Sequence, residues 1–113
     1  MKAHQQRSEG DQLLAVLAAL ANQHRLRIVG ALDRDGRNYV SQLARDIGIS
    51  RPLLHLHLQK LEEAGLVSSH HEVSSDGKAL NYFTVVSFDI ALTPQTITEA
   101  ADSLTAPHAK SEP

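Results

Sequence analysis

The sequence predicts a mainly α-helical domain of about five helices, with a small two-stranded β-hairpin between the fourth helix and the fifth. Three observations lead to this fold class. Apolar residues recur at helical spacing through much of residues 11–64. A tight turn around Gly48 joins two short helical segments. An Asp-Gly turn then separates two β-rich runs, residues 66–73 and 79–86. Two helices joined by a tight turn and followed by a hairpin form a winged helix-turn-helix.

The amino-acid composition limits which class of protein this sequence can be. The 113 residues suffice for one small domain, which we place at 11–105, between a flexible arm (1–10) and a flexible tail (106–113). Without cysteine the chain has no disulfides and no thiolate metal ligands. The apolar run 13–21 is too short to cross a membrane and lacks the flanks of a signal peptide, so we expect a cytoplasmic protein.

The first two helices are expected at about 11–21 and 23–33. Asp11 can cap the first of them, and Asn22 can cap the second. Turn residues fill the loop 33–38 that follows. Tyr39 and Val40 then either begin the third helix or form a very short strand.

The helix-turn-helix itself spans residues 40–65. Gly48 can adopt the positive φ that ends the third helix. Ser50 is a good N-cap for a fourth helix at about 51–64, and Pro52 lies in its first turn. An apolar stripe follows, and Gly65 ends the helix. After the hairpin, Thr93 and Pro94 are typical of the start of a last helix, at about 94–104.

The charge is unevenly distributed. The net charge of −2 is unusual for a DNA-binding domain, which tends to be basic. Yet residues 24–60 hold seven Arg or Lys against three acids, whereas one lysine and four acids lie beyond residue 80. The cations therefore collect around the helix-turn-helix, either as a DNA-facing surface or as ordinary solvated helix surface.

Two segments resemble one known family. ALANQHRLRIVGAL, which ends at Leu32, and ISRPLLHLHLQKLEEAGLV, residues 49–67, are similar to the second-helix opening and the recognition helix of ArsR/SmtB transcriptional regulators. The resemblance covers roughly residues 11–104. It implies a homodimer with the first and last helices at the interface, wings flanking the DNA, and transcription control, often by a metal ion. For this chain the implied interface residues are Leu13, Leu17, Ile97, Ala101 and Leu104.

Candidate DNA contacts follow from the helix-turn-helix and the wing. Side chains at the start of a recognition helix reach base edges or phosphates, and the preceding helix and the wing tip flank them. Residues 55 and 57 are about 200° apart on a helix, so they cannot share a metal site. We expect His55 to face DNA and His57 to be a partly buried structural residue. The DNA-binding candidates are Ser41, Gln42, Arg45, Ser50, Arg51, Leu53, His55, Gln59, Lys60 and Lys78.

The resemblance does not provide a complete metal site in this sequence. Neither familiar metal site of the family is intact: residues 39–44 contain no cysteine, and the last helix has no histidine before His108. His4 and His108 are tentative ligands for Ni(II) or Zn(II), or else two unrelated tail histidines. His70 and Glu72 share one face of a strand and could form part of a site, although exposed polar wing residues are commoner.

No catalytic motif occurs, so we do not expect an enzyme. The first functional hypothesis is a homodimeric transcription regulator that binds double-stranded DNA at an inverted repeat, with a metal ion as a candidate signal. The alternatives are a protein-interaction module on the same scaffold, or a DNA-binding subunit whose signal is sensed by a partner protein.

Overall fold

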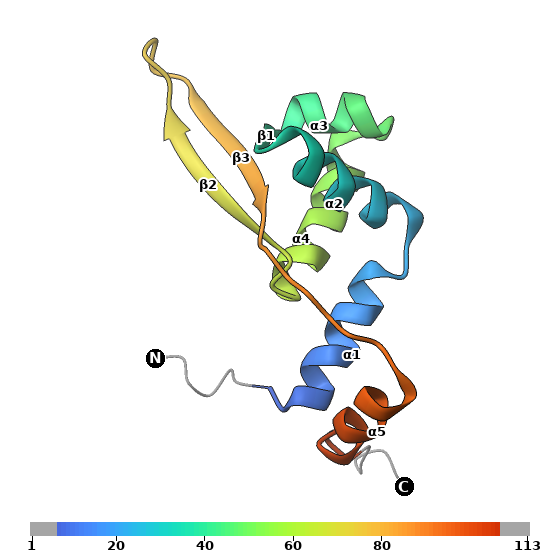
Figure 1. Cartoon of the computed structure of the whole chain (residues 1–113). Helices are drawn as coiled ribbons and strands as arrows, with labels where there is room; N and C mark the ends of the chain where they lie inside the picture. The colour runs from blue at the N-terminus through green and yellow to red at the C-terminus, as the bar shows by residue number, and fades with distance from the viewer. Residues whose placement is uncertain (1–6, 107–113) are drawn as a thin grey trace, which may run out of the picture.

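The computed structural model describes residues 7–106 and contains five helices and a small antiparallel sheet (Figure 1). This agrees with the predicted winged helix-turn-helix. In chain order the elements are α1 (Glu9–Leu20), α2 (Gln23–Asp35), β1 (Asn38–Tyr39), α3 (Val40–Ile47), α4 (Arg51–Glu63), β2 (Val67–Val73), β3 (Ala79–Val85) and α5 (Pro94–Asp102). None of the helices between residues 7 and 106 is long and apolar enough to cross a membrane.

The expected caps set the geometry of the helix-turn-helix. The Asn22 side-chain oxygen accepts hydrogen bonds from the backbone N–H groups of His24 and Arg25, at 2.9 and 3.2 Å. Gly48 has a φ of 84°, and its N–H donates to the Ala44 carbonyl at 2.8 Å. The Ser50 hydroxyl oxygen accepts from the Leu53 N–H at 3.3 Å. These contacts confirm the predicted starts of α2 and α4 and the predicted end of α3.

The start of α1 differs from the prediction. Ser8 is the N-cap, because its hydroxyl oxygen accepts the Asp11 N–H at 3.1 Å, and the helix begins at Glu9. Asp11 is therefore not the cap; its carboxylate accepts the backbone N–H of Thr105 at 3.0 Å instead. α1 thus begins two residues before the predicted start at about residue 11. Residues 1–6 and 107–113 lie outside the described part of the chain.

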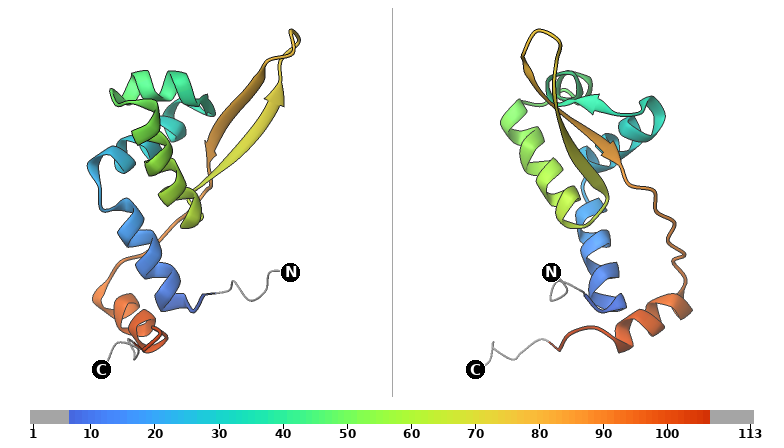
Figure 2. Two further views of the ribbon diagram at one scale, coloured as in Figure 1. Left: turned by 180° about the vertical axis from the view of Figure 1, so that it is seen from behind. Right: turned by 90° about the vertical axis from the view of Figure 1, so that its left-hand side faces the viewer.

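The sheet has the strand order β1-β3-β2 and is antiparallel throughout. Tyr39 pairs with Tyr82, so the short-strand alternative for Tyr39 is correct and α3 begins at Val40. The sheet thus has a third short strand beyond the predicted two-stranded hairpin. β2 and β3 continue past it as a two-stranded wing, with Gly77 at a φ of 87° in the turn. Figure 2 shows this wing extending away from the helices.

The hydrophobic core lies between α2, α3, α4 and the base of the sheet. Its large and fully buried side chains are Ile28, Leu32, Leu43, Leu54, Leu58, Leu61 and Leu66. α1 adds Val16 and Ala19 at its edge, whereas α5 buries none of its residues. An extended segment, residues 86–93, carries the chain from the wing to α5, which lies alongside α1 at the far end of the molecule (Figures 1 and 2).

Candidate nucleic-acid interface

α4 presents one face to the core and the other to solvent. Leu54, His57, Leu58 and Leu61 are its buried residues. With 3.6 residues per turn, the opposite direction is centred on Pro52, Leu56 and Gln59. His55 is exposed and His57 is only 7% exposed, as the sequence predicted. The exposed face therefore carries all the predicted contacts on α4: Arg51, Leu53, His55, Gln59 and Lys60.

The positive charge available to a ligand is smaller than the sequence count suggests. Arg34 is paired with Asp35 at 3.1 Å, and Arg37 with Glu72 at 3.2 Å. Within residues 7–106, the side chains of Arg51, Lys60 and Lys78 make no ion pair. These three cations are exposed on the start of α4, its last turn and the wing tip, and they are the charges best placed to meet phosphates.

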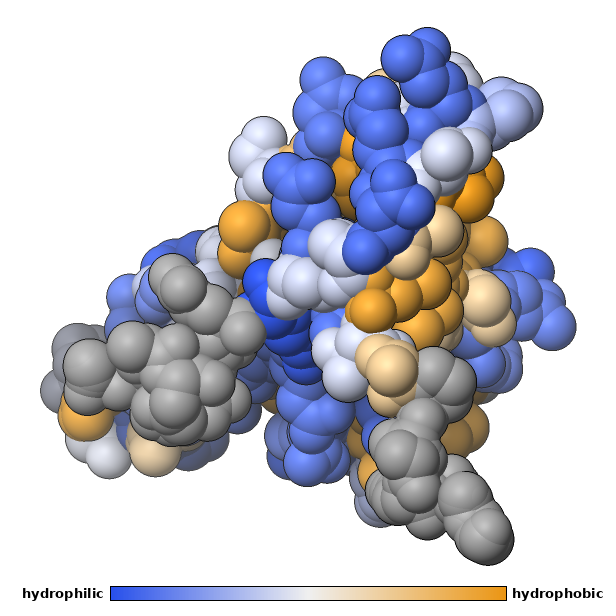
Figure 3. All heavy atoms as spheres, turned by 90° about the horizontal axis from the view of Figure 1, so that it is seen from below, coloured by the Kyte–Doolittle hydropathy of each residue, from blue (hydrophilic) through white to orange (hydrophobic). Residues whose placement is uncertain are grey.

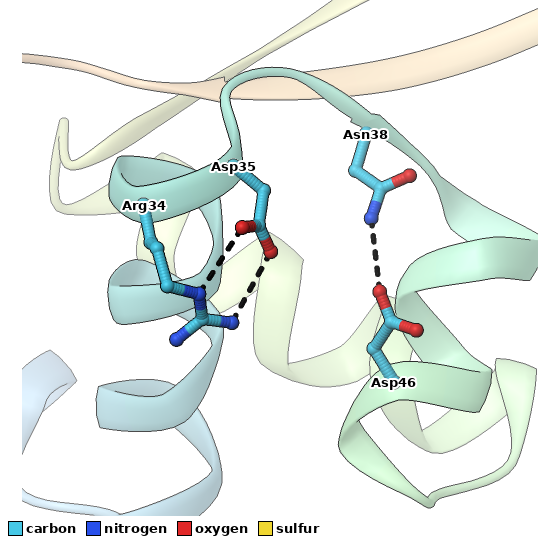
Figure 4. Close-up of polar contacts among 4 residues, drawn as sticks. All are labelled: Arg34, Asp35, Asn38 and Asp46. Atoms are coloured by element: carbon cyan, nitrogen blue, oxygen red, sulfur yellow. Dashed lines mark hydrogen bonds and ion pairs between the residues drawn. The ribbon is translucent and has the colours of Figure 1, made fainter.

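The predicted DNA contacts on α3 take part in a series of hydrogen bonds on the surface. Arg45 donates to the Gln42 side-chain oxygen at 2.6 Å, and the Gln42 amide donates to Asp46 at 2.7 Å. Asn38 donates to the other Asp46 oxygen at 3.3 Å (Figure 4, which also shows the Arg34–Asp35 pair). Ser41 is half-buried at the start of the helix. These hydrogen bonds hold the exposed side chains of Arg45 and Gln42 along one edge of α3. Asp46 partly neutralises the positive charge there.

The wing tip carries Lys78 beside an ionised carboxylate. The Ser74 hydroxyl oxygen accepts the Lys78 N–H at 3.0 Å, and its O–H donates to Asp76. The hydrogen bonds from Ser74 and from the Lys78 backbone lower the pKa of Asp76 below its usual range. The tip is therefore a hydrogen-bonded turn that presents the exposed cation of Lys78.

A cluster at the base of the wing was not anticipated from the sequence. The Arg37 guanidinium lies 4.1 Å from the centre of the Tyr82 ring and is paired with Glu72. His70 stacks on the same ring at 5.2 Å and approaches the Ser68 hydroxyl at 3.1 Å. His70 and Glu72 are thus engaged within the wing, which gives no support to a metal site there. No group of three His, Cys, Asp or Glu side chains within residues 7–106 is arranged to hold an ion.

His57 joins three helices beneath the exposed face. Its Nδ1 accepts a hydrogen bond from Arg25 Nε at 3.2 Å, and its ring centre is 5.4 Å from that of His24. Arg25 also donates to the carbonyl oxygen of Ala19 in α1 at 3.4 Å. Burial, with the charge of Arg25 and the proximity of His24, lowers the pKa of His57. A neutral, structural His57 follows.

An apolar groove runs between α1 and α5. It has a volume of about 170 Å³ and is lined by Gly10, Leu13, Leu14, Leu17, Ile97, Ala100, Ala101 and Leu104. All five predicted interface residues are among them. Gly10 is required by the packing, because a Cβ there would lie 2.1 Å from the Ala100 carbonyl oxygen. Figure 3 shows apolar surface exposed at this end of the molecule, where Leu14 is 58% and Ile97 49% exposed.

Comparisons with known proteins place this geometry in a family. The family model described as "Bacterial regulatory protein, arsR family" matches residues 22–69. The crystal structure of a possible transcriptional regulatory protein (fragment 1–100) from Mycobacterium bovis is 32% identical, over 66% of this chain and 74% of that one, with a TM-score of 0.57. The chain belongs to the ArsR family of bacterial regulatory proteins.

Two further solved structures share this fold. A solution structure from M. bovis, described as a homodimeric winged helix-turn-helix DNA-binding domain of a possible ArsR-family regulator, has a TM-score of 0.60, with 26% identity over 79% of this chain and 70% of that one. HlyU from Vibrio cholerae shares the fold, with a TM-score of 0.57 and 22% identity over 89% of this chain and 91% of that one. The family and the fold are those of transcriptional regulators rather than enzymes, as the sequence predicted.

The ArsR-family match is concentrated in the helix-turn-helix. An uncharacterized helix-turn-helix regulator from Methanocaldococcus jannaschii is 41% identical over 51 residues, which is 45% of this chain and about half (53%) of that protein. The family model likewise runs from Asn22 to Ser69, and so leaves α1, β3 and α5 outside. The family model therefore does not cover the groove between α1 and α5.

Proposed function

We propose that this ArsR-family chain is a homodimeric transcription regulator that binds an inverted-repeat operator in double-stranded DNA. The single observation that carries the proposal is the exposed face of α4, with Arg51 and Lys60 unpaired within the described residues. A helix displayed in this way enters the major groove, and flanking elements contact the backbone. α3, with Arg45, and the wing tip, with Lys78, serve as those flanking elements.

The apolar groove supports the homodimer. Leu14, Ile97 and Leu104 are each more than 40% exposed, and they line one surface at the end of the molecule away from the wing. A second copy covers this surface when α1 and α5 pair with their counterparts about a two-fold axis. The M. bovis relative described as homodimeric supports the same assembly. Two recognition helices related by such an axis fit half-sites about one helical turn, or about 34 Å, apart.

A mobility-shift experiment with genomic DNA fragments tests the proposal. Wild-type protein at low salt is expected to retard a subset of fragments, and Arg51→Ala and Lys60→Ala should each weaken the retardation. Arg34→Ala is the matched control, because that guanidinium is already paired with Asp35. If wild type retards no fragment at low salt, the DNA-binding function is wrong and the protein-docking alternative is favoured.

We further propose that any direct control by Ni(II) or Zn(II) acts through His4 and His108. Both residues lie outside the described part of the chain, and residues 7–106 provide no cluster of three suitable ligands. Calorimetric titration with each metal should show binding by wild type that His4→Ala and His108→Ala reduce. Binding that neither substitution changes would exclude these residues. If wild type binds neither ion, the signal has to be sensed by other means, such as a partner protein.

A further inference from the structure

Exposed leucines occupy part of the solvent face of α4. Leu56 is 56% exposed and points within about 30° of the direction opposite the buried stripe. Leu53, one turn earlier on the same helix, is 38% exposed. Single exposed leucines are ordinary on protein surfaces. Here the two lie one turn apart on the exposed side of the helix proposed to enter the major groove; Leu53 is about 90° from the outward direction, and Gln59 is about 30° from it on the side opposite Leu56.

The cationic side chains of α4 lie away from the outward direction. On a helical wheel Arg51 and Lys60 are each rotated by roughly 70° or more from the outward direction, on opposite sides of it. The outward direction therefore holds Leu56 and Gln59 but no arginine to make the bidentate contact to guanine that is commonest in direct readout. The thymine C5-methyl is the apolar group that a base presents in the major groove. The chemistry of this surface thus matches A·T pairs better than G·C pairs.

Charge along the helix indicates which half approaches the DNA. Glu62 and Glu63 are exposed at the C-terminal end of α4, where they repel phosphates. Glu62 also accepts a hydrogen bond from the Ser69 hydroxyl at 3.0 Å, which directs it toward β2. Arg51 is exposed at the opposite end. The N-terminal half of α4, which contains Leu53 and Leu56, is therefore the half that enters the groove.

We propose that Leu56 and Leu53 are specificity-determining residues that contact thymine methyl groups in the major groove, so that each operator half-site contains A·T pairs opposite the first two turns of α4. Gln59 lies on the same face, and its amide suits the N6 and N7 atoms of an adenine. This inference rests on the proposed function, because it names the sequence class that the same surface selects.

Replacing thymine by deoxyuridine tests the contact, because it removes the methyl group and keeps the base pair. Operators are first selected from random DNA with the full chain, and affinities are then measured by fluorescence anisotropy with and without uracil in the selected half-sites. Each contacted methyl that is lost should weaken wild-type binding about fourfold, the equivalent of about 0.8 kcal/mol.

The variants assign the effect to a residue. Leu56→Ala should lose the response to uracil at the thymine that Leu56 contacts and keep the response that depends on Leu53. Leu56→Gln, which keeps a long side chain and good helix propensity, should behave in the same way. Leu26→Ala is the matched control, since Leu26 is also 56% exposed but lies on α2, and it should keep the wild-type preference for thymine.

The outcomes separate this inference from the proposed function. If wild type binds selected DNA but prefers G·C half-sites, or is insensitive to uracil, the thymine-methyl contact is wrong while DNA binding stands. Full wild-type uracil sensitivity at every thymine in both Leu56 variants also overturns the assignment to Leu56. If wild type selects no DNA at all, the proposed function fails and the two leucines are better explained as a protein contact.

Discussion

The two ends of this molecule are built differently. The helix-turn-helix end packs leucines from α2, α3 and α4 to between 0 and 1% exposure. The other end pairs α1 with α5, and α5 buries none of its residues. Apolar side chains at this second end line an open groove instead of a core. The first end is thus complete within one chain, whereas the second leaves an apolar surface exposed, which we propose is covered by a second copy.

The largest effect should come from the core of the first end. Leu61 is fully buried, so Leu61→Ala should lower the free energy of unfolding by about 2–5 kcal/mol, through lost transfer energy and the cavity left behind. Urea denaturation measures this change in the free energy of unfolding. Leu26→Ala removes the same atoms from an exposed site and should cost roughly 0.5 kcal/mol or less. Equal losses in the two variants would contradict the assignment of Leu61 to the core.

At the second end, Leu14→Glu should break the dimer and leave the monomer folded. A glutamate placed in the groove would be buried without a partner charge in each copy, and this should raise the dimer dissociation constant by about 100-fold or more. Sedimentation velocity gives the oligomeric state, and circular dichroism the helix content. Leu26→Glu introduces the same charge at an equally exposed site on α2 and should remain dimeric. A dimeric Leu14→Glu protein would mean that the groove is not the interface.

A smaller effect, on DNA affinity, is expected when single cations at the first end are replaced by alanine. Each lost phosphate contact should lower the slope of log affinity against log salt by about 1, so Arg51→Ala should bind DNA more weakly and with less salt dependence. Lys78→Ala distinguishes a wing-phosphate contact from a solvated turn lysine, which would leave the slope unchanged. Arg34→Ala serves again as the control. An unchanged slope for Arg51→Ala would remove that residue from the interface.

The smallest effect concerns the junction between the two ends, where His57 contacts Arg25. The pKa of His57 is lowered below its reference value of 6.5, so the unfolded chain takes up a proton at a higher pH than the folded chain. Stability is therefore full above about pH 6.5 and decreases as the pH falls below it. Urea denaturation at pH 7.5 and 5.5 should show this loss in wild type and less of it in His57→Gln. The exposed His55→Gln should behave like wild type.

The sequence predicted local features well because they depend on near neighbours. Asn22, Gly48 and Ser50 were assigned from residue type and spacing, and the structure shows each in its expected role. The amphipathic stripe of α4 likewise placed His57 inside and His55 outside. The five groove residues came from the family resemblance, and the structure brings them together on one surface.

The errors and omissions depend on contacts that are distant in sequence. Asp11 was expected to cap α1, but it bonds to Thr105, which packing alone brings near. The cluster of Arg37 and Tyr82 required the register between β1 and β3. Leu56 is missing from the predicted DNA contacts because these are polar apart from Leu53, yet with 3.6 residues per turn it lies about 30° from the direction opposite the buried stripe.

We propose that one end of the molecule recognises DNA and that the other joins two such ends. The most direct measurement compares the affinity of wild type and Leu14→Glu for a complete inverted repeat and for a single half-site. Wild type should bind the complete repeat about 100-fold more tightly or better, through the linked second contact, and Leu14→Glu should bind both DNAs with nearly equal affinity. No preference in wild type, or a full preference retained by a monomeric Leu14→Glu protein, would contradict the claim.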